Sequence, residues 1–255
     1  MTALSFKGRV AVVTGATRGI GWGVAEALGA AGAHVIAVGR TVGALEELDD
    51  AIQAKGGEAS TLVPINLTDY DAIDRLGAAI YERWGRLDIL VGNAGTLGQL
   101  SPLGHIPPKV WDEVIGVNLT ANWRLIRSLD PLLRQSDAGR AVFLTAAQPH
   151  TGEPFWGATA ASKAGLEALI KTYANEIAHT RVRANLVDPG PTRTQFRAKA
   201  YPGEDAETVA PAKRHAPAIL ALLTPACLEN GTLVDLGRTM ADDGVLASER
   251  TTGLA

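Results

Sequence analysis

The sequence predicts an α/β fold with a doubly wound parallel sheet, on three observations. Short runs rich in β-branched residues alternate with longer segments of helical periodicity. The short runs are predominantly apolar, as in strands that helices cover on both faces. The first run leads into a glycine cluster, and a helical segment follows it. Sheets of this kind bind ligands at the carboxyl ends of their strands.

Seven strands and five long helices are expected along the chain. The strands are placed at 9–14, 34–38, 61–65, 87–91, 140–144, 182–187 and 232–235. The helices are placed at 19–31, 42–55, 69–84, 108–135 and 157–179. No repeat, low-complexity tract or linker divides the chain, so residues 1–255 are expected to form one domain.

Two segments lie outside this alternation. Segment 191–215 is charged and contains proline, which fits either a plain surface loop or a mobile substrate flap. Residues 237–255 are expected to form a C-terminal tail.

Composition excludes several classes of function. The net charge is −3, and the 24 Lys and Arg residues are scattered, so neither nucleic acid nor a membrane surface is expected as a partner. No apolar run approaches the roughly 20 residues of a membrane span, and no signal peptide is visible. One cysteine, Cys227, cannot form an internal disulfide. We therefore expect a cytoplasmic protein, and no metal site is predicted.

The glycine cluster predicts a dinucleotide site. It reads VTGATRGIG from Val13 to Gly21, between the first strand and the first helix. Gly15, Gly19 and Gly21 let the backbone turn tightly and approach a pyrophosphate at the helix N-terminus. Glycines also serve plain turns, but the strand before and the helix after favour a Rossmann-like site.

The end of the second strand predicts the cofactor. An acidic residue there would bind a free ribose hydroxyl, whereas arginine suits a 2′-phosphate. No Asp or Glu occurs between Glu26 and Glu46, and Arg40 follows the strand, with Arg18 in the glycine loop. These two residues favour NADP(H) over NAD(H), unless both are ordinary surface arginines.

Four further motifs resemble the short-chain dehydrogenase/reductase family. They are Asn93-Ala-Gly95, Asn118, Lys163 and Asp188-Pro-Gly190. With the glycine loop, they follow the family's order and spacing from about residue 7 to 236. The resemblance implies a seven-stranded Rossmann-like sheet and hydride transfer between nicotinamide and a carbonyl or alcohol. It also implies a homodimer or homotetramer.

Several family positions carry other residues here. Gly92 replaces the first asparagine of the family's Asn-Asn-Ala-Gly, and Asn66, beside Leu67, replaces its acidic adenine contact. The closing Val-Asp-Gly-Gly survives as Val234-Asp-Leu236. The cofactor contacts implied by the resemblance are Gly15, Thr17, Arg18, Gly19, Ile20, Gly21, Arg40, Asn66, Leu67, Asn93, Ala94, Gly95, Lys163, Pro189, Gly190, Thr192 and Thr194.

The largest departure concerns catalysis. In the family, a tyrosine four residues before the active-site lysine exchanges a proton with the substrate oxygen. A serine thirteen residues further upstream holds that oxygen, and an asparagine completes a proton relay. Lys163 and Asn118 match the lysine and the asparagine, but Thr159 stands at the tyrosine position and Ala146 at the serine position.

Few neighbours can take over the proton transfer. An alkyl alcohol such as Thr159 is a weaker acid than tyrosine, whose own pKa is about 10. Thr145 is expected to point to the opposite face of its strand. Tyr173 lies about 21 Å along the helix, too far away. His150 could act as a general acid or base, although a loop histidine is more often a surface residue; Tyr201 in the flap is a weaker candidate.

The sequence therefore leaves two readings of function. In one, the protein is an NADP(H)-dependent oxidoreductase with impaired or altered chemistry, in which Lys163 contacts the cofactor ribose. In the other, it is a non-catalytic cofactor-binding protein, a redox sensor or a partner subunit, and Lys163 could even be a solvated helix charge. The two replacements fit a natural loss of function and also residues introduced by design. No residue of the pocket segments names a substrate.

Overall fold

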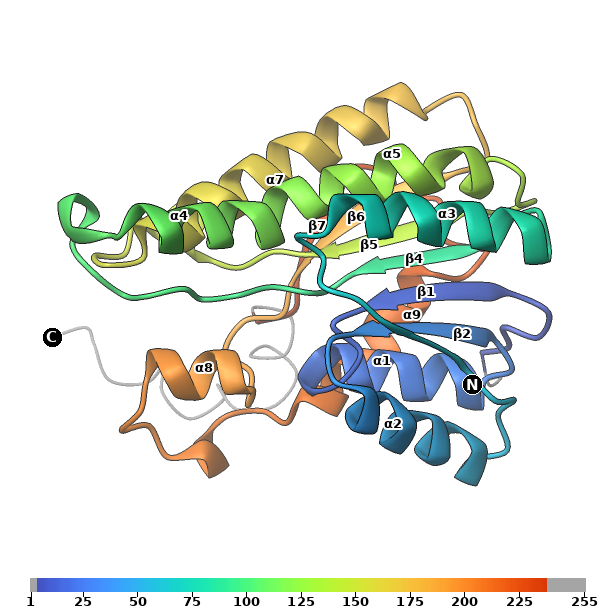
Figure 1. Ribbon diagram of the computed structural model, residues 1–255, viewed down its shortest axis with the longest axis horizontal. Helices are drawn as coiled ribbons and strands as arrows, with labels where there is room; N and C mark the ends of the chain where they lie inside the picture. Colours follow the sequence, from blue (N-terminus) through green and yellow to red (C-terminus); the bar gives the residue numbers. More distant parts are fainter. Residues whose placement is uncertain (1–3, 238–255) are drawn as a thin grey trace, which may run out of the picture.

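Seven parallel strands form a single sheet in the computed structural model, which describes residues 4–237 (Figure 1). The strand order is β3-β2-β1-β4-β5-β6-β7. The strands are β1 (Val10–Thr14), β2 (His34–Gly39), β3 (Thr61–Pro64), β4 (Ile89–Gly92), β5 (Arg140–Leu144), β6 (Arg183–Asp188) and β7 (Leu233–Asp235). The predicted doubly wound, Rossmann-like fold is confirmed.

Helices cover both faces of the sheet. One layer holds α1 (Gly19–Ala30), α2 (Val42–Ala54) and α9 (Ala216–Leu222). The other layer holds α3 (Tyr70–Trp84), α4 (Pro108–Ile115), α5 (Ala121–Leu133) and α7 (Gly157–Glu176). Because the central strands β1, β2, β4, β5 and β6 are buried on both faces, they read as predominantly apolar runs in the sequence.

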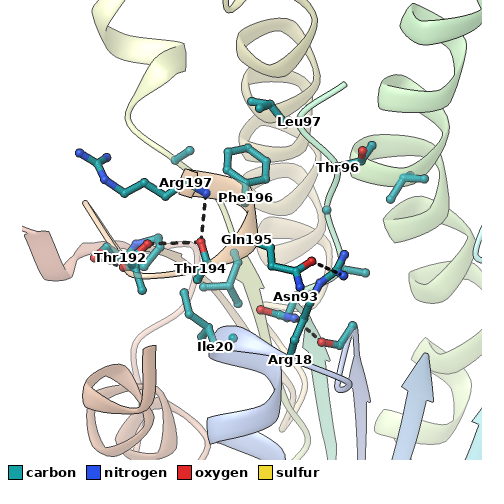
Figure 2. A pocket seen from close by; sticks show the side chains of 18 of the residues that line it. Arg18, Ile20, Asn93, Thr96, Leu97, Thr192, Thr194, Gln195, Phe196 and Arg197 are labelled. Atoms are coloured by element: carbon teal, nitrogen blue, oxygen red, sulfur yellow. Dashed lines mark hydrogen bonds between the residues drawn. The ribbon is translucent and has the colours of Figure 1, made fainter. Parts of the chain in front are cut away.

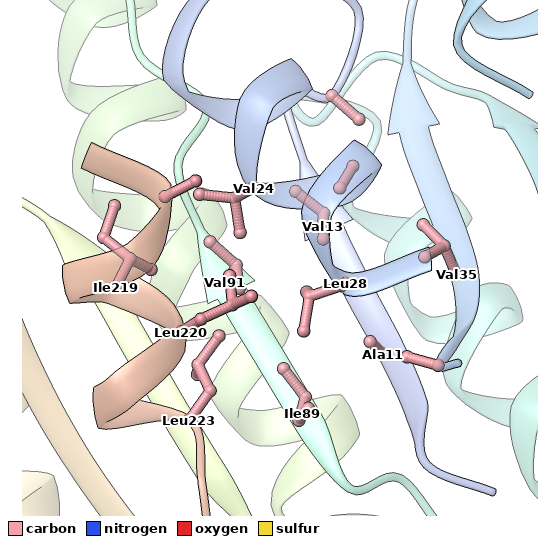
Figure 3. Packing of buried hydrophobic residues seen from close by; sticks show 14 of the residues in the cluster. Ala11, Val13, Val24, Leu28, Val35, Ile89, Val91, Ile219, Leu220 and Leu223 are labelled. Atoms are coloured by element: carbon pink, nitrogen blue, oxygen red, sulfur yellow. The ribbon is translucent and has the colours of Figure 1, made fainter. Parts of the chain in front are cut away.

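Each face has its own hydrophobic core. Figure 3 shows the first, in which Val24 and Leu28 of α1 pack with Ile219 and Leu220 of α9 over the central strands. The second core joins the other sheet face to α3, α5 and α7, with Phe143 fully buried. Together the two cores fix the strand ends that carry the site.

Local signals explain where the helices begin and end. The Asp69 carboxylate accepts a hydrogen bond from the Ala72 amide and caps α3. The same helix stops at Gly85, whose φ of +67° is the left-handed conformation that glycine adopts freely. Pro107 and Pro108 open α4, where the missing amide costs no helical hydrogen bond.

Two helix predictions need correction. The helix expected over 108–135 is interrupted, because a π-helical turn at Gly116–Thr120 separates α4 from α5. Segment 191–215 is not irregular throughout, since it contains the short helix α8 (Gln195–Ala200), and α9 directly after it was not predicted. The other boundaries shift by up to three residues.

Of the expected tail 237–255, only Gly237 falls within the described residues. Across the described part of the chain, no helix combines the length and apolar character that a membrane span requires.

Candidate functional site

A cavity of about 650 Å³ opens at the carboxyl ends of the parallel strands (Figure 2). Ligand pockets typically hold roughly 300–1,000 Å³. The strand order reverses between β1 and β4, whose neighbouring ends contribute Gly15 and Asn93 to the lining. At such a switch point the loops diverge and leave a crevice for a ligand.

The glycine loop has the shape that a pyrophosphate needs. Gly15 and Gly19 have φ values of +62° and +60°, which other residues rarely adopt. A Cβ on Gly15 would lie 2.9 Å from Asn93 Nδ2, and one on Gly21 would lie 2.4 Å from Gly15 O. The N-terminus of α1 follows at once and has no side-chain cap, so its first amides remain free for an anion. The loop therefore fits a dinucleotide phosphate.

Hydrogen bonds lock this loop to the next strand. The Thr14 hydroxyl accepts from the amides of Asn93 and Ala94 at 3.0 and 3.1 Å, and donates to Val91 O at 3.1 Å. Asn93 Nδ2 donates back to Thr14 O at 2.9 Å. Although Gly92 stands where the family has an asparagine, the glycine loop thus keeps its hydrogen bonds to the end of β4.

Arginines mark one end of the cavity. Arg40 is exposed at the end of β2, and Arg18 Nη1 donates to Gln195 Oε1 at 2.6 Å. Asn66 and Leu67 line the same cavity. Among the described lining residues, the carboxylates are Glu113 and Asp188, neither of which follows β2. A free ribose hydroxyl therefore finds no acidic partner at the end of this strand.

Lys163 is no solvated helix charge. Its side chain is 5% exposed, lines the cavity, and donates from Nζ to Leu144 O at 2.6 Å. Burial lowers its pKa to about 8, against the opposing influence of Asp188 and Glu167. The ammonium group thus faces the space that a ligand would fill.

Asn118 lies behind the cavity wall, within the π-helical turn. Its Oδ1 accepts from the Thr96 amide at 2.8 Å, and its Nδ2 donates to Thr96 O and Ser162 Oγ, each at 3.0 Å. Turns of this type often occur at functional sites. Here the turn carries the asparagine that fixes the loop after β4.

The two replaced positions present no hydroxyl to the cavity. Ala146 lines it with a methyl group. Thr159 is fully buried outside the lining residues, and its hydroxyl donates to Leu97 O at 3.1 Å. The shorter side chain at position 159 therefore leaves open the space in front of Lys163.

His150 lies beside the cavity rather than in its lining. Its Nε2 is 3.1 Å from the buried Glu167 carboxylate, which also accepts from the Thr145 hydroxyl at 2.8 Å. Thr145 also lines the cavity, directly before Ala146, and its hydroxyl is engaged by the Glu167 carboxylate. Glu167 was missed in the sequence because it reads as an ordinary helix charge.

The segment after β6 forms the opposite wall. Gly190 turns with a φ of +64°, and its amide donates to Asp188 Oδ1 at 2.9 Å; burial raises the pKa of Asp188. The Thr192 hydroxyl lies 2.8 Å from Nε2 of the buried His215, and Thr194 Oγ1 caps α8 through the Arg197 amide at 3.3 Å. Pro189 also lines the cavity.

Tyr201, the other alternative to the missing tyrosine, belongs to the cavity wall, whereas His150 does not. It lines the cavity and donates to Glu153 Oε1 at 2.9 Å. Its ring lies 5.9 Å from that of Trp156, which also meets Phe196 at 6.2 Å. Nothing in the sequence pattern predicts this cluster, because its members come from separate loops.

The fold and the cavity together define a dinucleotide-binding α/β protein of the oxidoreductase type. A family profile of short chain dehydrogenases matches residues 9–205, and the chain belongs to that family.

Three relatives illustrate the similarity. The uncharacterized oxidoreductase YciK of Escherichia coli (strain K12) is 37% identical over 199 residues, covering 77% of this chain and 79% of YciK. A solved structure assigned as a short chain dehydrogenase from Pseudomonas syringae has a TM-score of 0.88 and 36% identity, covering 92% of this chain and 96% of that one. A third, from Shigella flexneri and complexed with NADP, has a TM-score of 0.87 and 33% identity, covering 92% and 99%.

Proposed function

We propose that this protein binds NADP(H) in preference to NAD(H) and that its turnover of ordinary carbonyls and alcohols is weak. One observation carries the proposal: the cavity keeps the glycine loop, the arginines and Lys163, while positions 146 and 159 give it no hydroxyl. The Shigella relative complexed with NADP supports the choice of cofactor.

Different residues of the cavity bind different parts of the cofactor. The free amides at the start of α1 and the two arginines bind phosphates, because bidentate guanidinium groups suit a dianion. Lys163 donates one ammonium proton to Leu144 O, and a second would bind a ribose hydroxyl of the cofactor. When bound, the cofactor would supply hydride chemistry, and the family resemblance implies that Thr192 and Thr194 would hold its carboxamide.

The expected loss of rate is large. General acid–base catalysis contributes about 10²–10⁴ in rate. Removal of a donor to the reacting oxygen costs about 10²–10³ more by analogy with oxyanion holes. The two losses overlap, since both act on one oxygen. Affinity for the cofactor depends on other residues and should persist.

A second function rests on the same observation. The Thr159 hydroxyl is committed to Leu97 O, which favours a protein that binds the cofactor without turning it over, as a redox sensor or a partner subunit. In this alternative the substrate end of the cavity has no catalytic task.

Consumption of NADPH distinguishes these possibilities. Wild type and the double variant Ala146→Ser/Thr159→Tyr are assayed with a panel of aldehydes and simple ketones. Weak turnover by the wild type with a gain in the double variant supports the proposal. Equal turnover in both contradicts it and moves attention to His150 or Tyr201. Tight NADPH binding without turnover in either supports the sensor or partner function.

A further inference from the structure

The substrate end of the cavity has flat aromatic walls. Trp156 precedes α7, while Phe196 and Tyr201 belong to α8 and its end, and all three line the cavity. Trp156 is 4% exposed, so it forms a fixed wall, and the other two rings are half-buried against it. Phe196 is labelled in Figure 2 on the α8 side of the pocket, with Leu97 on the loop that follows β4.

This wall lies toward the opposite edge of the sheet from Arg40, although Arg18 reaches its border through a hydrogen bond to Gln195, the residue before Phe196. Arg40 follows β2, near one edge of the sheet, whereas the aromatic residues follow β5 and β6, toward the other edge. Lys163 stands between the two ends. A dinucleotide that spans from Arg40 to Lys163 therefore leaves the aromatic end for a second molecule.

The charged groups near this wall are already paired or exposed. Arg197 binds Glu204 through two hydrogen bonds of 2.6 Å, and its guanidinium lies 4.5 Å from the centre of the Tyr201 ring. The Tyr201 hydroxyl is taken by Glu153. Lys199 and Glu113 are exposed at the rim. Among the described residues, Lys163 is the buried cation that lines the cavity, and the wall itself adds no second one, so the wall suits a neutral planar ring.

The replaced catalytic positions narrow the chemistry further. A simple ketone becomes a strongly basic alkoxide on reduction, and positions 146 and 159 present no donor to it. A quinone instead becomes a phenolate, comparable in basicity to ionised tyrosine with a pKa of about 10. Such an anion needs a far weaker proton donor.

We propose that this cavity takes a neutral planar quinone, stacked against Trp156, Phe196 and Tyr201, with Lys163 Nζ as the proton donor to its oxygen. This inference rests on the proposed binding of NADP(H). Bound NADPH would supply a hydride, which carries two electrons and one proton, to one quinone oxygen, and this leaves the other oxygen as a phenolate. Lys163 would supply the second proton to that phenolate, so that the quinone becomes a hydroquinone and NADPH becomes NADP⁺, and solvent would reprotonate the amine. With a pKa of about 8, the ammonium gives its proton to a phenolate with a gain of roughly a hundredfold.

Binding tests the inference without turnover. Protein loaded with NADP⁺ cannot reduce a quinone, so calorimetric titration reports affinity alone. The probes are 2,3-dimethyl-1,4-naphthoquinone, whose substituted ring positions resist attack by Cys227, and decalone, a saturated bicyclic ketone. The quinone is expected to bind at least about tenfold more tightly, since each aromatic contact adds about three- to tenfold.

Two variants locate the contact. Phe196→Leu keeps apolar bulk and removes one flat face, so quinone affinity should fall about three- to tenfold and decalone affinity less than about twofold. Phe155→Leu is the control, because Phe155 is an exposed neighbour outside the lining residues. This control substitution should change neither the quinone affinity nor the decalone affinity. Equal affinities for the two probes, or equal losses for both in Phe196→Leu, would overturn the inference.

The same titrations in cofactor-free protein separate this inference from the proposed function. Ring selectivity without any NADPH binding would leave the aromatic site in place and refute the cofactor assignment. NADPH binding without ring selectivity would support the cofactor assignment and refute the aromatic site. Turnover adds a third readout: with NADPH, the wild type should reduce the naphthoquinone and leave decalone unchanged.

Discussion

Replacing Gly15 by alanine tests the glycine loop with a matched control. Gly15 and Gly56 both have a left-handed backbone, with φ of +62° and +83°. A Cβ on Gly56 meets nothing within 4 Å, whereas one on Gly15 lies 2.9 Å from Asn93 Nδ2 and 3.0 Å from Ala94 Cα. The two alanine variants thus share the backbone strain and differ in the clash.

The magnitude follows from these contacts. The left-handed conformation costs alanine about 1–2 kcal/mol at either position. At Gly15 the displaced Asn93 also loses hydrogen bonds to Thr14 O and Gly15 O, each worth about 0.5–1.5 kcal/mol. At about 2–4 °C per kcal/mol, Gly56→Ala should lower Tm by roughly 2–8 °C and Gly15→Ala by several degrees more.

Thermal unfolding and NADPH titration by fluorescence measure both effects. Gly15→Ala should raise the Kd for NADPH at least about tenfold, a loss of 1.4 kcal/mol, and Gly56→Ala should leave it unchanged. An unchanged NADPH Kd in Gly15→Ala, beside a normal Tm, would refute the assignment of the loop to phosphate binding.

Three further predictions concern the remaining parts of the site. Arg40→Ala should raise the Kd for NADPH at least about tenfold and that for NADH less than twofold, and equal effects on both would contradict a 2′-phosphate contact. Burial lowers the pKa of Lys163 from 10.5 in the unfolded chain to about 8 in the folded protein. Between these two pH values the unfolded state binds more protons, so the contribution of Lys163 to the free energy of unfolding rises with pH. Urea unfolding should therefore show that the free energy of unfolding of wild type, relative to that of Lys163→Met, rises by about 2.4 kcal/mol from pH 7.5 to pH 10, and parallel curves would contradict the burial of the Lys163 amine. His150→Ala should leave NADPH-dependent turnover within about twofold, whereas loss of a true general acid would cost about 10²–10⁴.

The sheet was predictable because buried parallel strands leave a direct record in the sequence. Runs such as 141–144 are apolar throughout, and this pattern distinguishes them from the amphipathic segments between them. The glycine loop was equally predictable, because its backbone angles require glycine at positions 15 and 19.

The interruption at Gly116–Thr120 was not predictable from periodicity. The apolar spacing of 108–135 continues through it, and the turn coincides with hydrogen bonds that Asn118 makes to Thr96 and Ser162, distant in sequence. Tertiary contacts of this kind leave no periodic signal.

The substrate end was the least predictable part of the site. Trp156, Phe196 and Tyr201 meet only because α8 folds over the cavity. Glu167 likewise reads as a surface charge, although the fold buries it beside Thr145 and His150. Residues in loops and on crossing helices depend on the whole fold, which one chain segment does not encode.

The central claim is that the cofactor half of the site works without its proton-transfer half. The most direct test is calorimetric titration of NADPH into wild type and Ala146→Ser/Thr159→Tyr, paired with carbonyl turnover by each. The account predicts equal Kd values, within about threefold, and turnover at least about a hundredfold higher in the double variant. Absent or much weaker NADPH binding in the wild type would contradict it.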